Sequence, residues 1–353
     1  MTGRTHQEPP APHRRRRPGE GFAVAVVGAG SWGTAFARHL ALQGVETTLL
    51  ARRTEQAEQM RRSHRNPDYL SHLELPSGLS FGVYETADLS QTSLLVMAVP
   101  SKAYAEVIRS LAPRLRGGIG ILSLTKGVEP ATLHRLSEVL ETELKALSPK
   151  VAVLSGPNHA EEVAEDQPTA AVIASTDVEF AAALQEIVTS ETLRAYVNSD
   201  LVGVEFAGAV KNIIALATGM SDGLGFGDNA RAALITRGLA EMTRLGLGLG
   251  AERQTFAGLA GLGDLVGTCT SRHSRNRLAG EMIARGHAPD TVEAEMGMIA
   301  EGMTTAPAIL TVASRSGVEL PITENVVAIL RGRKDVRASV RDLMARQPRS
   351  ESL

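Results

Sequence analysis

Residues 22–33 read Phe22-Ala-Val-Ala-Val-Val-Gly28-Ala-Gly30-Ser-Trp-Gly33. The first six residues are apolar and include three valines, which is typical of a strand buried on both faces. A helix-like run, residues 34–42, follows the glycines, and Gly44 stands where a helix C-cap belongs. A strand, a Gly-x-Gly-x-x-Gly loop and a helix in this order predict a dinucleotide-binding site.

Each glycine of this loop has a distinct expected task. Gly28 permits the tight turn, and Gly30 lets the backbone approach a pyrophosphate. Gly33 lets the helix lie close to the strand, so that the N-terminus of the helix faces the anion. The alternative is a strand–turn–helix without a ligand.

The end of the second expected strand, residues 45–50, bears on the choice of nicotinamide cofactor. Folds that select NAD place an acidic residue about 20 positions after the glycines, where it holds the ribose 2′-hydroxyl. Here the chain has Arg52 and Arg53, and guanidinium groups suit a 2′-phosphate. We therefore expect NADP(H) to be preferred, with NAD(H) also usable. The alternative is that the arginines only begin a solvated helix over residues 54–63.

Strand, loop and helix repeat through the first half of the chain. Further strands are expected at residues 93–99, 119–124 and 151–154, with helices at about 101–112 and 131–147. This order predicts an α/β fold, a Rossmann-type doubly wound and mostly parallel sheet, over residues 21–199. Ligands of such sheets bind at the carboxyl ends of the strands, so the glycine loop, Arg52, Lys126 and residues 156–158 should meet in one crevice.

The second half, residues 200–346, reads as an all-α substrate domain. Helices are expected over residues 201–220, 230–245, 274–285, 304–316 and 323–330. Lys211 lies among apolar and small residues of the first of these helices. Burial would lower the pKa of such a lysine and suit it to general acid–base catalysis. The alternative is a lysine whose head extends to the surface.

Three other polar features are candidates for the site. Lys126 follows a strand, although taken alone it would be read as a surface lysine. Asp264 is the sole charge in a glycine-rich segment, where it could cap a helix or pair with Lys211. The segment Ser274-Arg275-Asn276 begins a helix with the groups that bind a phosphate.

The overall composition argues against several other classes of function. The chain has 353 residues, a net charge of -2 and only 3% aromatic residues, so nucleic-acid binding is not expected. No metal-ligand spacing such as His-x-x-x-His is present, no apolar run suggests membrane insertion, and the single Cys269 suits a reducing compartment. Residues 1–20 and 347–353 are expected to be a disordered extension and tail.

Several segments together resemble bacterial NAD(P)-dependent glycerol-3-phosphate dehydrogenase. They are residues 28–35, 124–128, 155–157, 208–213, 261–265 and 268–277, and the resemblance spans residues 22–330 in order. It implies a cytoplasmic homodimer that interconverts dihydroxyacetone phosphate and sn-glycerol 3-phosphate by hydride transfer, supplying glycerophospholipid synthesis.

The resemblance also implies a role for each matching position. Lys211 is the catalytic proton donor and acceptor. The substrate contacts are Lys126, Gly156, Asn158, Lys211, Asp264, Ser274, Arg275 and Asn276. The cofactor contacts, beside the three glycines, are Ser31, Trp32, Arg52, Arg53, Tyr69, Lys126, Ala160, Arg275, Ile299 and Glu301.

One departure concerns the shape of the pocket. The family usually has Gly-Pro-Ser-Phe-Ala where this chain has Gly156-Pro-Asn158-His159-Ala160. Asn158 can still donate a hydrogen bond, but His159 replaces an apolar ring. Two other functions remain open: a related two-domain dehydrogenase of a hydroxy acid or acyl thioester, and a non-catalytic dinucleotide sensor.

Overall fold

The computed structural model describes residues 22–347, and its first half is built on one eight-stranded sheet. The strand order is β3-β2-β1-β4-β5-β6-β7-β8, and every neighbouring pair is parallel except β6 and β7. The prediction of a doubly wound, mostly parallel sheet is therefore confirmed. The strands are β1 (Ala23–Val27), β2 (Glu46–Ala51), β3 (Leu79–Val83), β4 (Thr92–Met97), β5 (Gly120–Ser123), β6 (Lys150–Ser155), β7 (Thr169–Ala174) and β8 (Leu193–Asn198).

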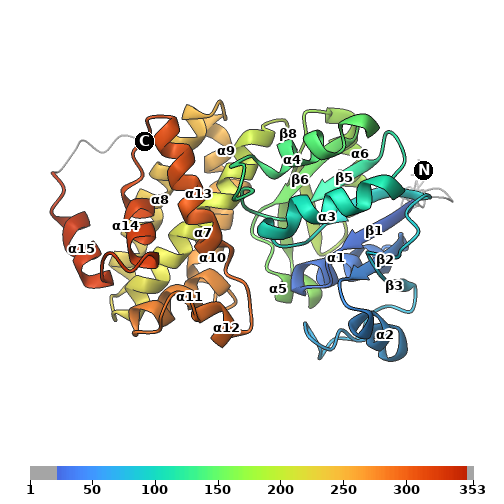
Figure 1. The fold of residues 1–353 in the computed structure, drawn as a ribbon, viewed down its shortest axis with the longest axis horizontal. Coiled ribbons are helices and arrows are strands. Elements are labelled where there is room, and N and C mark those ends of the chain that lie inside the picture. The colour runs from blue at the N-terminus through green and yellow to red at the C-terminus, as the bar shows by residue number, and fades with distance from the viewer. Residues whose placement is uncertain (1–21, 348–353) are drawn as a thin grey trace, which may run out of the picture.

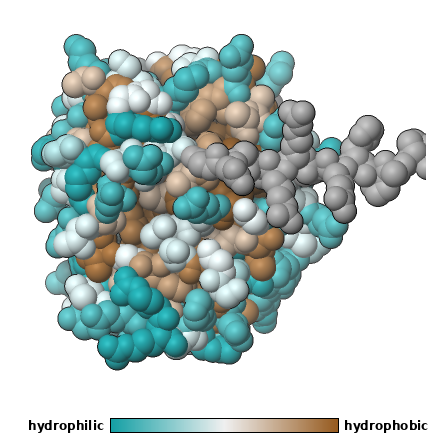
Figure 2. Space-filling view, turned by 90° about the vertical axis from the view of Figure 1, so that its right-hand side faces the viewer, coloured by the Kyte–Doolittle hydropathy of each residue, from teal (hydrophilic) through white to brown (hydrophobic). Residues whose placement is uncertain are grey.

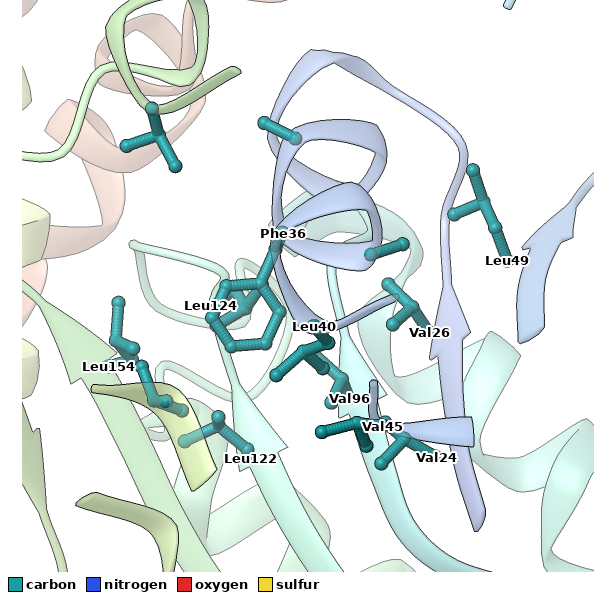
Figure 3. Packing of buried hydrophobic residues seen from close by; sticks show 14 of the residues in the cluster. Val24, Val26, Phe36, Leu40, Val45, Leu49, Val96, Leu122, Leu124 and Leu154 are labelled. Atoms are coloured by element: carbon teal, nitrogen blue, oxygen red, sulfur yellow. The ribbon is translucent and has the colours of Figure 1, made fainter. Parts of the chain in front are cut away.

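Helices cover both faces of this sheet (Figure 1). On one face Phe36 and Leu40 of α1 (Ser31–Leu42) pack against Val24 and Val26 of β1 and against the neighbouring strands, as Figure 3 shows. The apolar side chains of α3 (Tyr104–Leu111) and α4 (Leu136–Glu143) form a separate core on the other face. The central strands are continuous apolar runs because both of their faces are buried in this way. The remaining helices of this domain are α2 (Thr54–Ser63), α5 (Ala160–Ala164) and α6 (Val178–Val188).

The second half of the described chain is a helical domain arranged around α7 (Leu201–Gly223). Most of α7 is buried, and α11 lies against it at very close range. A methyl group on Gly280 of α11 would come within 2.1 Å of the carbonyl oxygen of Leu216. The other helices are α8 (Asp228–Gly248), α9 (Arg253–Ala257), α10 (Asp264–Thr270), α11 (Arg275–Ala284), α12 (Val292–Met296), α13 (Glu301–Arg315), α14 (Pro321–Leu330) and α15 (Val336–Met344).

Helix α7 is also the one described helix that is long and apolar enough to cross a membrane by length and composition. Its most apolar window is 94% buried inside the protein. The core of the helical domain therefore accounts for its apolar character.

Two parts of the sequence prediction differ from the structure. The helix expected over residues 131–147 begins only at Leu136, because residues 128–135 form a short bridged turn in which Leu133 has a φ of 66°. Strands β3, β7 and β8 were not predicted. Strand β8 lies at the edge of the sheet and exposes alternate residues, so it lacks the long apolar run that marks the central strands.

The expected terminal extension and tail lie largely outside the described residues, which begin at Phe22 and end at Gln347. The change from sheet to helices falls between Asn198 and Leu201.

Figure 2 shows the surface of the nucleotide domain at the end away from the helical domain. Polar and apolar residues alternate on this face.

Candidate active site

The glycine loop lines a cleft of about 770 Å³ to which both domains contribute residues. Gly28 has a φ of 112°, and a methyl group on Gly33 would come within 1.9 Å of the carbonyl oxygen of Gly28. Gly28 is restricted to glycine by this positive φ and by the backbone of Ala98, and Gly33 by the close contact between helix α1 and the turn. Gly30, in contrast, has open space where a side chain would lie. The loop therefore has the room that a pyrophosphate would need, and the site fits a dinucleotide.

A buried amide from the segment after α2 holds the glycine loop in place. Asn66 is completely buried, and its Nδ2 donates hydrogen bonds to the carbonyl oxygen of Ala29 (3.0 Å) and to Oγ1 of Thr34 (2.8 Å). Its Oδ1 accepts the backbone N–H groups of Asp68 (3.1 Å) and Tyr69 (3.3 Å). One side chain thus fastens the glycine loop to the segment that carries Tyr69.

The basic pair lies in the same part of the cleft. Arg52 and Arg53 follow β2, and both line the cleft together with Tyr69 and Asp68. The guanidinium of Arg53 forms an ion pair with the carboxylate of Asp68. Arg52 makes no ion pair or hydrogen bond with any described residue.

The buried charges of the cleft are centred on one carboxylate. Asp264 is 2% exposed and contacts two lysines from different domains. Nζ of Lys211, on α7, lies 2.5 Å from Oδ1 of Asp264 and 2.7 Å from Oγ1 of Thr268. Nζ of Lys126 lies 2.9 Å from Oδ2 of Asp264 and 2.9 Å from Oδ1 of Asn158. Two ammonium groups share one carboxylate, so this cluster is positive when both lysines are protonated.

These contacts shift the ionisation of Lys211 and Asp264. Burial lowers the pKa of Lys211 to about 8, with a further lowering by Lys126 and an opposing effect of Asp264. Burial alone would raise the pKa of Asp264, but Lys126 and Lys211 together hold that pKa below its usual value. The cluster therefore combines a permanent carboxylate with a lysine that can gain or lose a proton near neutral pH.

Polar groups on α11 line the cleft as well. Oγ of Ser274 caps this helix by accepting the backbone N–H of Arg277 (3.2 Å). Nδ2 of Asn276 donates to Oδ1 of Asn212 (3.0 Å), and Oδ1 of Asn276 accepts the N–H of Gly302 (2.8 Å). Arg275 lines the cleft without an ion pair or hydrogen bond to any described residue, so its guanidinium is free to bind an anion.

The start of α13 in the helical domain also contacts the nucleotide domain. Ile299 and Glu301 line the cleft, and Oε2 of Glu301 accepts the hydroxyl of Ser101 (2.5 Å) while Oε1 accepts its backbone N–H (3.2 Å). Burial raises the pKa of Glu301, and these hydrogen bonds oppose that shift. This contact ties the start of α13 to the loop after β4.

Asn158 and His159 lie where the chain departs from the expected family pattern. Asn158 is 7% exposed, and its Nδ2 has no hydrogen-bond partner among the described residues. His159 lines the cleft, and its Nε2 lies 3.3 Å from the carbonyl oxygen of Gly267 on α10. Burial, and secondly Lys211, lower the pKa of His159, so the ring is neutral at pH 7 and donates this hydrogen bond.

The cleft brings together most residues that the sequence had singled out. Two candidates do not line it: Gly33 lies behind the loop against Gly28, and Gly156 contributes a carbonyl oxygen 3.1 Å from Nζ of Lys126. The predicted site residues that do line it are Gly28, Gly30, Ser31, Trp32, Arg52, Arg53, Tyr69, Lys126, Asn158, Ala160, Lys211, Asp264, Ser274, Arg275, Asn276, Ile299 and Glu301.

Sequence reasoning missed Asn66 and Asp68. Both lie in an irregular segment after α2, where no periodic pattern marks a buried or ligand-facing side chain. No cluster of three or more potential metal ligands occurs among the described residues.

Comparison with known proteins agrees with this geometry. Residues 23–181 match the N-terminal family model, and residues 200–341 the C-terminal family model, of NAD-dependent glycerol-3-phosphate dehydrogenase. The chain belongs to this family. It is 47% identical over 334 residues to a glycerol-3-phosphate dehydrogenase [NAD(P)+] of Salinibacter ruber, covering 93% of this chain and 96% of that protein. A protein of the same name from Nitratidesulfovibrio vulgaris is also 47% identical, covering 93% and 99%.

Solved structures of this family and of other dehydrogenases have the same fold as this chain. The glycerol-3-phosphate dehydrogenase of Coxiella burnetii superimposes with a TM-score of 0.88 at 39% identity, covering 92% of this chain and 99% of that one. A D-mandelate dehydrogenase shares the fold alone, with a TM-score of 0.61 at 13% identity over 88% of this chain and 98% of that one. This glycerol-3-phosphate dehydrogenase family member is therefore an oxidoreductase.

Proposed function

We propose that the chain is an NAD(P)-dependent sn-glycerol-3-phosphate dehydrogenase that interconverts dihydroxyacetone phosphate and sn-glycerol 3-phosphate. The observation that carries the proposal is the pair of lysines on one buried carboxylate, in the same cleft as the glycine loop and Arg275. Such a cleft offers one place for a dinucleotide, one for a phosphate and one for a carbonyl oxygen.

The nucleotide end of the cleft suits a nicotinamide dinucleotide. The glycine loop and the N-terminus of α1 would hold the pyrophosphate, because free backbone N–H groups and the helix dipole favour an anion there. Trp32 and Tyr69 line the same region, and Arg52 and Arg53 would face the adenosine ribose. When bound, the nicotinamide supplies the hydride. NADP(H) is the preferred cofactor under this proposal, with NAD(H) also used.

The substrate end would hold dihydroxyacetone phosphate by its two ends. Arg275 and the α11 N-terminus would bind the phosphate through charge-assisted hydrogen bonds. The unpartnered Nδ2 of Asn158 and the ammonium of Lys126 would contact the other end of the substrate, which carries the ketone and a hydroxyl. Contacts remote from the ketone would fix its orientation and so lower the barrier to reaction.

Lys211 would transfer the proton in this reaction. As the ketone is reduced, its oxygen becomes alkoxide-like and needs a proton, and a positioned ammonium can donate it. A pKa of about 8 keeps Lys211 largely protonated at neutral pH while easing the loss of its proton. Asp264 and Thr268 would hold Nζ in position, and in the reverse direction the neutral amine would accept the proton.

Cellular role and assembly are part of the same proposal. The family resemblance supports a cytoplasmic homodimer. Its product, sn-glycerol 3-phosphate, would supply glycerophospholipid synthesis. The single cysteine of the chain is buried, which accords with a reducing compartment.

A direct assay tests the proposed function. NADPH oxidation is followed with dihydroxyacetone phosphate, then with NADH in its place, and then with a 2-keto acid as substrate. We expect turnover with dihydroxyacetone phosphate and none with the 2-keto acid, because Arg275 and the α11 N-terminus suit a phosphate. Binding of NADPH without turnover would instead indicate a dinucleotide sensor.

A further inference from the structure

Asp68 is an acidic residue inside the region where the sequence predicted only basic ones. It lines the cleft with Arg52 and Arg53, and its carboxylate forms an ion pair with Arg53. Because Arg52 makes no ion pair with any described residue, the two arginines are not equivalent. Only one of them offers an uncompensated positive charge to a ligand.

The backbone at Asp68 is held by a hydrogen bond to a buried side chain. The backbone N–H of Asp68 donates to Oδ1 of Asn66, 3.1 Å away, and the amide of Asn66 is itself bonded to Ala29 of the glycine loop. The completely buried Asn66 therefore links the backbone at Asp68 to the segment that would hold the pyrophosphate. Asp68 thus lines the cleft together with Arg52 and Arg53, the residues that would face the adenosine ribose.

A carboxylate at this point affects the two cofactors differently. A 2′-phosphate would have to displace Asp68 from Arg53 and would lie close to a like charge, which is unfavourable. A ribose 2′-hydroxyl meets no such repulsion and can donate a hydrogen bond to a carboxylate, as in folds that select NAD. The ion pair thus lowers the advantage that two arginines would otherwise give NADP(H).

We propose that Asp68 is a specificity-determining residue, which limits the preference for NADP(H) over NAD(H) by pairing with Arg53. The inference rests on the proposed function, since it concerns the cofactor of the same site. It predicts that the ratio of affinities for the two cofactors depends on a residue from the loop after α2, outside the segment after β2 that carries the arginines.

Binding measurements on Asp68→Asn test this inference without relying on turnover. Calorimetry would compare adenosine 2′,5′-bisphosphate with adenosine 5′-monophosphate, and NADPH with NADH. Asparagine keeps the backbone contact to Asn66 but removes the charge. We expect tighter binding of the 2′-phosphorylated ligands by about threefold to tenfold, in line with the small energy of an exposed ion pair, and little change for the others.

Glu74→Gln is the matched control. Glu74 is an exposed carboxylate of the same segment, it lies 3.7 Å from Arg65, and it does not line the cleft. It should leave both affinities unchanged. An affinity ratio that stays constant in Asp68→Asn, or that shifts equally in Glu74→Gln, would overturn the inference. Failure of every nucleotide to bind would overturn the proposed function with it.

A double-mutant cycle with Arg53→Gln tests whether Asp68 acts through Arg53. In the Arg53→Gln background, Asp68→Asn should change the ratio by less than about twofold, because the ion pair is already absent. An effect as large as in the wild-type background would show that Asp68 does not act by pairing with Arg53, and the inference would fall.

Discussion

The two domains contribute to the cleft in different ways. The nucleotide domain offers backbone groups and surface loops at the ends of its strands, with glycines that leave room for a ligand. The helical domain offers charged side chains from the interior of buried helices, such as Lys211 at 5% exposure on α7. Binding of the dinucleotide should therefore depend on local loop geometry, and catalysis on buried charges held by tertiary packing.

Replacing Lys211 is the strongest test of this division of tasks. Lys211→Ala removes the proposed proton donor, so we expect kcat to fall by about 100- to 10,000-fold, the usual contribution of a positioned acid. Nucleotide binding should persist, because Lys211 is not among the expected cofactor contacts. Quenching of Trp32, the only tryptophan of the chain and a residue of the cleft, can measure that binding.

Lys145→Ala serves as the control for charge removal. Lys145 is exposed on the nucleotide domain, away from the cleft, so its loss should leave kcat within about twofold of the wild-type value. Turnover near the wild-type rate in Lys211→Ala would remove the lysine from the mechanism. Loss of nucleotide binding in that variant would show that the two tasks are not separate.

The helical domain depends on close contacts between helix interiors, and Gly280→Ala tests that dependence. The added methyl group would meet the backbone of Leu216 and Met220 on α7, so α11 must move outward. We expect a loss of about 1–3 kcal/mol in the free energy of unfolding, a usual cost of overpacking, partly offset by the higher helix propensity of alanine. Because Arg275 and Asn276 lie on α11, KM for dihydroxyacetone phosphate should rise.

Gly78→Ala is the matched substitution in the nucleotide domain. Gly78 has no neighbour within 4 Å of an added methyl group, so its stability should change by no more than about 0.5 kcal/mol. Urea denaturation followed by circular dichroism measures both variants. Equal stabilities would mean that α7 and α11 separate freely, and the proposed role of their close contact would be wrong.

Whether a residue's role depends on local spacing or on contacts made only in the fold decides how much could be predicted from the sequence. The glycine loop was predictable because a turn, a helix start and an anion site all require particular residues at fixed spacing. Lys211 was singled out as a charge among apolar residues, but its partner Asp264 is 53 positions away in the chain, and pairing was only one of two readings. Asp68 could not be found, because only the fold brings its carboxylate to Arg53.

A buried carboxylate outside the cleft gives the smallest expected effect. It tests whether burial in the helical domain shifts the pKa of a side chain and so makes stability depend on pH. Glu241 of α8 is 3% exposed, and its Oε1 accepts the N–H of Ile322 at the start of α14 (2.5 Å). Burial raises its pKa from 4.5 to about 7, with hydrogen bonds from Ile322 and Thr323 opposing the shift. Since this pKa is higher in the folded than in the unfolded chain, its stabilising contribution is complete below about pH 4.5 and is lost as the pH rises through about 7.

Glu241→Gln should therefore flatten the pH dependence of stability. Glutamine keeps an acceptor oxygen for Ile322 but cannot ionise, so between about pH 5 and pH 8 the wild type should lose about 1–3 kcal/mol relative to the variant. The exposed Glu324→Gln on α14 is the control and should follow the wild type. Urea unfolding at several pH values measures this difference. Parallel curves for the wild type and Glu241→Gln would mean that α8 and α14 hold this carboxylate without a change in its ionisation on folding.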